Sequence, residues 1–147
     1  MNLNRKSIRT PVFFVLFLAM VLVASGCSKE AKLERHWKKG EQYLSENKPK
    51  EAALEYRNVI QLDPKHPKAR YKLGLTYLRM GMIREAYAEM SKTVELDPGM
   101  IDARNQLGQM YLLSGDRKKA REQAEAVLAK EAGNSSAHLL LSNVSLV

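Results

Sequence analysis

Hydrophobic and polar residues in the middle of the chain alternate with the period of amphipathic helices. The spacing predicts one helix over Pro67–Met80 and a second over Ile83–Leu96. Gly81 should end the first helix. Asp97-Pro98 should end the second, because proline cannot continue a helix and disfavours helical geometry in the residue before it. The apolar side of the first helix carries Leu73, Leu75, Tyr77 and Leu78. This segment is therefore predicted to form a helical hairpin.

Three types of residue recur through the chain at a period of 34 residues. They are the glycines Gly40, Gly74 and Gly108, the tyrosines Tyr43, Tyr77 and Tyr111, and the alanines Ala52, Ala86 and Ala120. Such a register indicates a solenoid of stacked units. Glycine inside a helix costs about 1 kcal/mol relative to alanine, so close packing must offset it. We expect each glycine to lie against the alanine of the paired helix, where a side chain would push the helices apart.

The repeated residues resemble the signature of the tetratricopeptide repeat, which runs from a Leu-Gly pair through Tyr and Ala to a closing Pro. The second unit matches it with Leu73, Gly74, Tyr77, Ala86 and Pro98. The first matches at Gly40, Tyr43, Ala52 and Pro64, with Lys39 in place of the leucine, and the third at Leu107, Gly108, Tyr111 and Ala120, with Ala132 in place of the proline. We expect Gly133 to end the last helix of the third unit instead.

The resemblance covers residues 33–147 and implies an all-α fold, a TPR solenoid of antiparallel helix pairs. Its units would be residues 33–66, 67–100 and 101–134, with a partial fourth unit over 135–147. The partial unit is apolar, with Leu139, Leu140, Leu141, Val144, Leu146 and Val147, whereas solenoids normally close with a polar capping helix. We therefore expect the chain to be the N-terminal part of a longer repeat protein. The alternative is that the last helix caps the array and packs its apolar side inward.

Residues 1–26 have the organisation of an export signal. Arg5, Lys6 and Arg9 precede an uninterrupted hydrophobic stretch, Val12–Val23, which is shorter than the roughly 20 apolar residues that a spanning helix needs. Small residues then lead to Cys27, the only cysteine of the chain. This junction resembles the lipobox of bacterial lipoproteins, although Ala24 stands where leucine is usual. We therefore interpret residues 1–26 as a lipoprotein signal peptide.

The lipobox resemblance implies that Cys27 is acylated and begins the mature chain, with residues 27–32 as a short tether. Several acyl chains would hold the protein stably in a bilayer. Ser28 follows the cysteine, and in enteric-type sorting Asp at that place retains lipoproteins in the inner membrane. The outer membrane is therefore favoured. An uncleaved membrane anchor and a free thiol behind an ordinary signal are the alternatives.

The chain is basic, with a formal net charge of +8. One group of bases follows the acylation site at Lys29, Lys32, Arg35, Lys38 and Lys39, and another occupies the third unit at Arg117, Lys118, Lys119 and Arg121. The second group could bind an anionic lipid or polysaccharide, or form a solvated face, and Asp116 is its expected N-cap. Nucleic acid is not an expected partner, because the chain carries an export signal and no aromatic residues interleave the bases.

In tetratricopeptide arrays the first helices of successive units line a concave groove. The family's spacing places in it Glu34, Trp37, Glu41 and Leu44, then Lys68, Tyr71, Leu75, Leu78 and Arg79, then Asp102, Asn105, Gln109, Leu112 and Leu113. Trp37 and Tyr71 are aromatic anchors for a docking peptide or protein segment, although Trp37 could instead only cover the first unit. Asn105 and Gln109 could hydrogen-bond a ligand backbone or stay solvated. Trp37 and Glu41 break the Lys and Asn set of chaperone-tail grooves, so binding of a chaperone tail is disfavoured.

The search for catalytic motifs is negative. His36, His66 and His138 lie far apart without metal-site spacing, and no phosphate-binding loop is present. The sequence therefore predicts no enzyme, no cofactor and no metal. It predicts a binding scaffold, lipid-anchored in the bacterial envelope and facing the periplasm.

The layout resembles lipoproteins of exosortase and exopolysaccharide systems, which carry long arrays after an acylated cysteine. One alternative is a pilotin-like lipoprotein that helps secretin subunits assemble in type IV pilus biogenesis. Another is the N-terminal docking array of a larger enzyme.

Overall fold

The computed structural model describes residues 28–145, and in this range every regular element is an α-helix. A first helix occupies residues 28–45. It is followed by α2 (Pro49–Leu62), α3 (Pro67–Arg79), α4 (Ile83–Leu96), α5 (Ile101–Leu113), α6 (Arg117–Leu128) and α7 (Ser135–Ser145). The all-α prediction is confirmed, and the two helices predicted in the second unit match α3 and α4 to within one residue. The predicted signal peptide and Cys27 lie outside the described residues.

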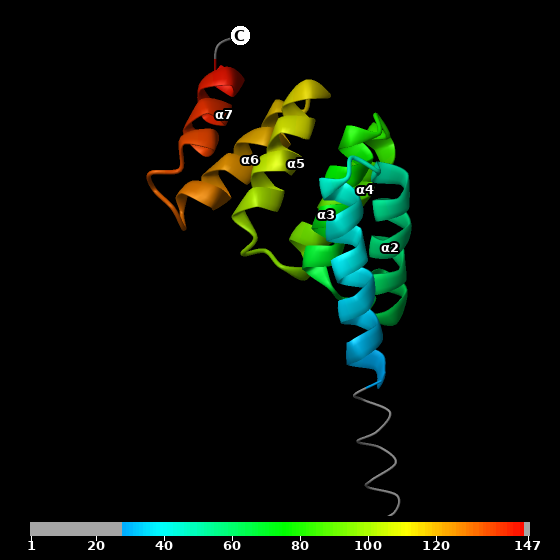
Figure 1. The fold of residues 1–147 in the computed structure, drawn as a ribbon. Helices are drawn as coiled ribbons and strands as arrows, with labels where there is room; N and C mark the ends of the chain where they lie inside the picture. The colour runs from blue at the N-terminus through cyan, green and yellow to red at the C-terminus, as the bar shows by residue number, and fades with distance from the viewer. Residues whose placement is uncertain (1–27, 146–147) are drawn as a thin grey trace, which may run out of the picture.

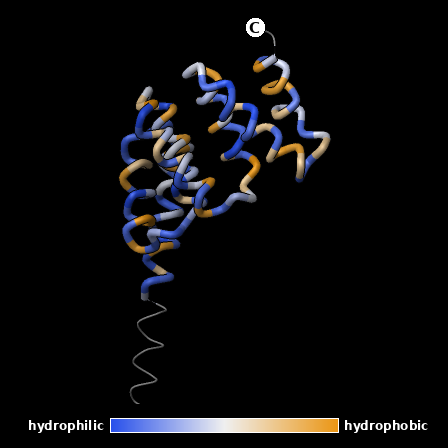
Figure 2. The backbone as a smooth tube through the Cα atoms, turned by 180° about the vertical axis from the view of Figure 1, so that it is seen from behind, coloured by the Kyte–Doolittle hydropathy of each residue, from blue (hydrophilic) through white to orange (hydrophobic). Residues whose placement is uncertain are grey.

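The helices pair and stack in chain order, as Figure 1 shows. From α2 onward each helix packs against the one that follows it, and α5 also packs against α7. Apolar positions recur along each helix among hydrophilic ones, which is the amphipathic pattern visible in Figure 2. The buried sides meet in three clusters, so the core is a row of contacts between neighbouring helices. No helix within residues 28–145 is long and apolar enough to cross a bilayer.

Each hairpin turn within a unit contains one residue with positive φ. These residues are Asn47 (φ 57°), Gly81 (φ 72°) and Gly115 (φ 81°), which occupy the same place in successive units. Left-handed backbone is disfavoured for most side chains, and glycine and asparagine tolerate it best. The turn therefore follows the same path three times, and Gly81 ends the helix before it as predicted.

The repeated glycines lie where helices approach closely. At Gly108 an added Cβ would lie 3.7 Å from the carbonyl oxygen of the expected Ala120, but at Gly40 and Gly74 the nearest atoms belong to other residues. A Cβ at Gly40 would lie 2.8 Å from the Tyr56 ring, and one at Gly74 would lie 2.9 Å from Cε of Met90. These neighbours stand one helical turn beyond the expected alanines, Ala52 and Ala86. The alanines are fully buried, so they serve close packing, while a larger side chain one turn further fills the space above each glycine.

In the third unit, a different helix supplies the side chain that covers the glycine. Ala124 occupies the place that Tyr56 and Met90 hold in the earlier units, and alanine is too short to cover Gly108. Leu140 of α7 covers it instead, since a Cβ at Gly108 would collide with the Leu140 side chain. The next helix therefore supplies the packing that this unit lacks.

The expected end of the sixth helix at Gly133 is wrong. Helix α6 ends at Leu128, and the amides of Lys130 and Glu131 both bond to the carbonyl of Val127 at 3.0 and 2.8 Å. These bonds tighten the last turn and satisfy the helix end several residues earlier than expected. Gly133 lies in the following loop, just before Asn134, whose Oδ1 accepts the amide of Ala137 at 3.0 Å and caps α7.

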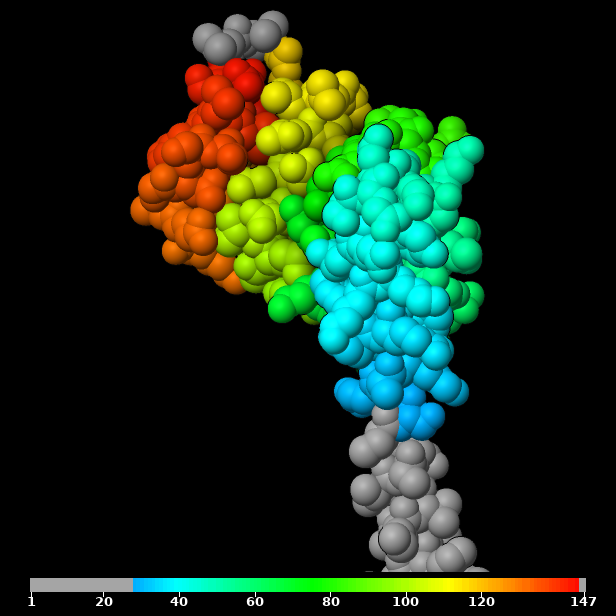
Figure 3. Space-filling model, viewed as in Figure 1, coloured from blue at the N-terminus to red at the C-terminus, as the bar shows by residue number. Residues whose placement is uncertain are grey.

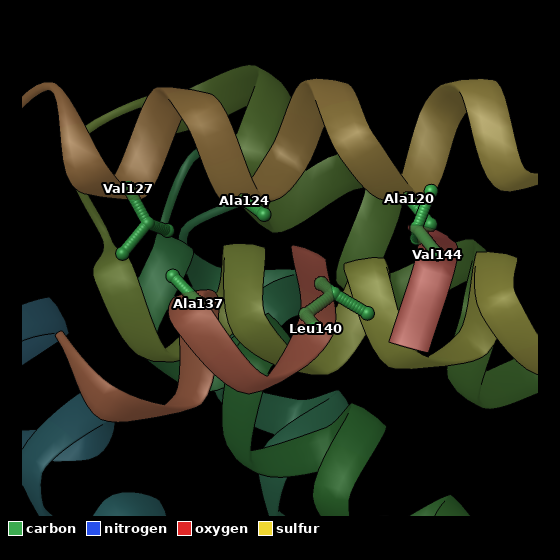
Figure 4. Close-up of a cluster of buried hydrophobic side chains, with 6 residues drawn as sticks. All are labelled: Ala120, Ala124, Val127, Ala137, Leu140 and Val144. Carbon is green, nitrogen blue, oxygen red and sulfur yellow. The ribbon is translucent and has the colours of Figure 1, made fainter. Parts of the chain in front are cut away.

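Helix α7 packs one apolar side against α6. Ala137, Leu140 and Val144 are buried against α6. Figure 4 shows them facing the α6 residues Ala120, Ala124 and Val127. Leu139 is the exception and is 63% exposed. It lies on another side of α7, where it contributes to the surface described next.

Candidate functional site

The first helices of successive units form one face of the solenoid. Figure 3 shows this face, with the first helix in cyan, α5 in yellow-green and α7 in red, and the surface recedes between the first helix and α5. We call this surface the inner groove. It comprises the exposed sides of the first helix, α3, α5 and α7. The side chains assigned to it from the sequence divide into three parts along the array.

At its N-terminal end, Trp37 is packed rather than free. Its ring meets Tyr56 edge-on at 5.7 Å and stacks on His66 at 5.7 Å. His66 itself caps α3, because its Nδ1 accepts the amide of Ala69 at 3.1 Å. Trp37 is half-buried and joins the first unit to the start of the second. The ring therefore covers part of the first unit, and its role as an anchor for a ligand stays a prediction.

Glu41 is likewise engaged inside the fold. Its carboxylate accepts the Tyr56 hydroxyl and forms an ion pair with Lys72 of α3, with 3.0 Å between Nζ and Oε2. Tyr56 is fully buried. Burial raises the pKa of Tyr56, and the bond to the Glu41 carboxylate raises it further. Glu41 therefore ties three helices together and places a carboxylate on this part of the groove, beside the half-buried Leu44.

The middle of the groove is formed by half-buried residues of α3. Tyr71, Leu75 and Leu78 pack against the cluster that contains Met90 and Leu107. Burial raises the pKa of the Tyr71 hydroxyl, and the negative charge of Asp102 on α5 adds to the effect. The outer sides of Tyr71, Leu75 and Leu78 are available to a ligand because each of these residues is only partly covered. Arg79, at the end of α3, is exposed.

At its C-terminal end the groove is apolar and open. Leu113 is 89% exposed and Leu139 is 63% exposed. A cavity of about 110 Å³ lies between α5 and α7, lined by Gln109, Leu112, Ser136, Leu139, Leu140 and Asn143. The α7 residues were missed from the sequence, although adding one 34-residue period to Asp102, Asn105 and Gln109 gives Ser136, Leu139 and Asn143. The 34-residue register would therefore have predicted these α7 positions, but the groove assignment was not extended into the partial fourth unit.

The side chain of Asn105 makes a contact within the fold. Its Nδ2 donates to Asn134 Oδ1 at 3.4 Å, which links α5 to the residue that caps α7. Its own Oδ1 is buried and has no hydrogen-bond partner within the described residues. Gln109, one turn further on, is exposed and borders the cavity. Of the two amides predicted to face a ligand, Gln109 is the more exposed.

The basic residues of the third unit surround the start of α6. Asp116 caps this helix as predicted, because its Oδ1 accepts the amide of Lys119 at 3.1 Å. It also pairs with the Lys119 ammonium at 2.9 Å, and this bond lowers the pKa of Asp116. Lys119 Nζ lies 5.3 Å from the centre of the Tyr111 ring. Arg117, Lys118 and Arg121 are exposed.

Within residues 28–145 no group of three or more His, Cys, Asp or Glu side chains is arranged to hold a metal ion. His36 instead pairs with Glu55 of α2, with 2.5 Å between Nδ1 and Oε2. His66 and His138 are each engaged with nearby main chain. The three histidines thus have separate local partners.

Comparison with solved structures agrees with the architecture. The first TPR domain of Spaghetti (RPAP3), bound to an HSP90 peptide, is similar with a TM-score of 0.71 at 23% identity, covering 78% of this chain and 91% of that one. The second TPR domain of human RPAP3, in complex with an HSP70 peptide, gives 0.72 at 22% identity, covering 81% and 99%. MamA from Desulfovibrio magneticus gives 0.70 at 22% identity, covering 77% and 64%. At these identities the likeness concerns the fold alone.

Family models agree with the repeat register. A model described as TPR repeat matches residues 40–81, and one described as tetratricopeptide repeat matches residues 78–144. A search of curated proteins gave no significant match. The matched segments span the turns, glycines and stacked helix pairs described above. The chain therefore carries tetratricopeptide repeats and folds, over its described residues, as an all-α solenoid of that repeat type.

Proposed function

We propose that the protein is a scaffold that binds a segment of another protein along its inner groove. The observation that carries this proposal is the exposure of Leu113 and Leu139 on neighbouring first helices, α5 and α7. Covering apolar surface releases about 25 cal/mol per Å², so a partner that buries these side chains gains affinity. Leu75, Leu78 and Leu112 extend the apolar surface along α3 and α5.

The chemistry of the groove favours an internal apolar segment over a free C-terminus. Two of the similar structures hold chaperone peptides, from HSP90 and HSP70. Here Trp37 is packed on Tyr56 and His66, and Glu41 presents a carboxylate in the same region. A carboxylate would repel the terminal carboxylate of a peptide, although Lys72 offsets part of its charge. The partner segment therefore docks mainly through apolar side chains.

Site-specific crosslinking tests this proposal. With p-benzoylphenylalanine in place of Tyr71, irradiation of intact cells should give one dominant covalent adduct, identified by mass spectrometry. The matched control carries the same group at Leu54, which is 52% exposed on α2 and lies outside the groove. The adduct should be absent there. A groove position that captures nothing above background, or the same adduct from both positions, would count against groove binding.

We further propose that acylated Cys27 anchors the scaffold in the bacterial envelope, facing the periplasm and preferring the outer membrane. Support comes from the lipobox-like junction, in which small residues follow a hydrophobic stretch and lead to Cys27. An acyl group at Cys27 would hold the solenoid close to the bilayer, where it could organise an exopolysaccharide export or exosortase-linked assembly.

Metabolic labelling tests the anchor separately from the groove. Cells fed an alkyne fatty acid should label the wild-type chain strongly and the Cys27→Ser variant not at all, because the thiol is the acylation site. Equal labelling of the two chains would exclude Cys27 as the anchor.

A further inference from the structure

A second and larger cavity lies between the second and third units, away from the inner groove. It measures about 500 Å³ and is open to solvent. Its lining comes from the first turns of α4, the last turn of α5 and the start of α6: Ile83, Arg84, Tyr87, Met110, Tyr111, Ser114, Asp116 and Lys119. This volume lies within the range of about 300–1,000 Å³ typical of ligand pockets.

The repeat register explains why this cavity exists. In the preceding junction, half-buried Met80 and Tyr77 pack against the buried cluster that contains Ala53. One period later these three places are held by Ser114, Tyr87 and Tyr111. Serine is too short to fill the space that methionine occupies, so the two tyrosines line an opening.

The walls of the cavity are held in place by their mutual contacts. The rings of Tyr87 and Tyr111 meet edge-on at 5.7 Å, and their hydroxyl oxygens lie 3.2 Å apart. Lys119 lies over the Tyr111 ring and is tied to Asp116. Ile83 remains 58% exposed and Tyr87 39% exposed. An apolar surface is thus presented to solvent on a preorganised frame.

The charges around the opening select the kind of ligand. Arg84 and Lys119 line the cavity against a single carboxylate, Asp116, which is already paired with Lys119. Arg84 makes no ion pair with any residue in the described range. Lys118 and Arg121 add exposed positive charge on α6. An anionic ligand with an apolar group complements this surface.

We propose that this cavity binds an acidic peptide segment of a partner protein, with one bulky apolar side chain inserted between Tyr87 and Ile83. Flanking carboxylates of the segment pair with Arg84 and with the bases of α6. The site is independent of the inner groove, so the scaffold can hold two segments at once. Aromatic side chains anchor such contacts most strongly, which makes phenylalanine a suitable probe.

Fluorescence anisotropy with a defined peptide tests the proposal on the full chain in dodecyl maltoside micelles. The probe is fluorescein-labelled Gly-Asp-Glu-Phe-Asp-Glu-Gly, and saturable binding is expected. Ser114→Met should weaken binding at least about tenfold, because methionine fills the opening as Met80 does one unit earlier. The backbone suits this change, since both residues cap their helices with αR geometry. The thermal unfolding temperature should stay equal or rise, which separates loss of the site from loss of the fold.

Further variants decide what occupies the site. Arg84→Glu and a probe with alanine in place of phenylalanine should each weaken binding at least about tenfold, while Leu139→Ser in the inner groove should leave it unchanged. The proposal is overturned if the probe does not saturate the wild-type chain, or if Ser114→Met binds it equally well. It is also overturned if only phosphatidylglycerol vesicles bind and Ser114→Met binds them as the wild type does.

Discussion

Replacement of Tyr56 with alanine is expected to destabilise the solenoid by about 3–5 kcal/mol, the range for deleting a large buried aromatic side chain. Tyr56 is fully buried, covers Gly40 and supports the ring of Trp37. The change also removes the hydroxyl that bonds to Glu41 and leaves a cavity between the first helix and α2. This loss is comparable with the total stability of many small domains, about 5–15 kcal/mol.

Urea unfolding followed by circular dichroism measures the effect of Tyr56→Ala. The matched control is Leu54→Ala on the same helix, which removes a half-exposed side chain and should change the free energy of unfolding by roughly 0.5 kcal/mol or less. Tyr56→Phe should fall between them, because it keeps the ring and loses only the bond to Glu41, at a cost of about 1 kcal/mol. Equal stabilities for Tyr56→Ala and Leu54→Ala would contradict the packing described for the first unit.

The second large effect concerns binding. The double substitution Leu113→Asp with Leu139→Asp is expected to lower affinity for the groove-bound segment at least about a hundredfold. A segment that covers either position would have to desolvate an unpaired carboxylate, and each loss of about 1.4 kcal/mol is tenfold in affinity. Both residues are exposed, so the substitutions leave no cavity in the core. The unfolding temperature should therefore change little.

Isothermal titration calorimetry measures the affinity of each variant for the segment captured from Tyr71. Leu54→Asp adds one carboxylate outside the groove, half the charge of the double variant, and should leave the affinity within about threefold of wild type. If the double variant binds as tightly as the wild type while remaining folded, the apolar end of the groove is not where the segment docks.

The 34-residue register was sufficient to predict the helices because each unit repeats the same physical requirements. Gly81 and Gly115 permit the left-handed turn, and Pro64 and Pro98 follow the ends of the second helices. The fold class needed nothing beyond these local signals. The end of α6 at Leu128 was harder to predict from the sequence. The third unit lacks the closing proline, and its turn is made by main-chain hydrogen bonds.

Side-chain partners were harder to predict because they depend on differences between the units. The register places Glu41 on the groove, but not its ion pair with Lys72 or its bond to Tyr56, which require the packing of three helices. The cover over Gly108 comes from Leu140 because Ala124 is small. Likewise, the lining of the larger cavity departs from the preceding unit, with Ser114 in the place of Met80 and Tyr87 in the place of Ala53. The repeated positions predict the helices and their stacking. The positions that differ between units determine the cover over Gly108 and the larger cavity.

The central claim is that the inner curve of the solenoid is its binding surface, and methyl NMR tests it most directly. On titration of the segment captured from Tyr71, the leucine methyl signals of Leu75, Leu113 and Leu139 should shift, because they line the groove on α3, α5 and α7. The methyl signals of Leu54 on α2 should not shift. Shifts at Leu54 with none at the three groove leucines would contradict the account.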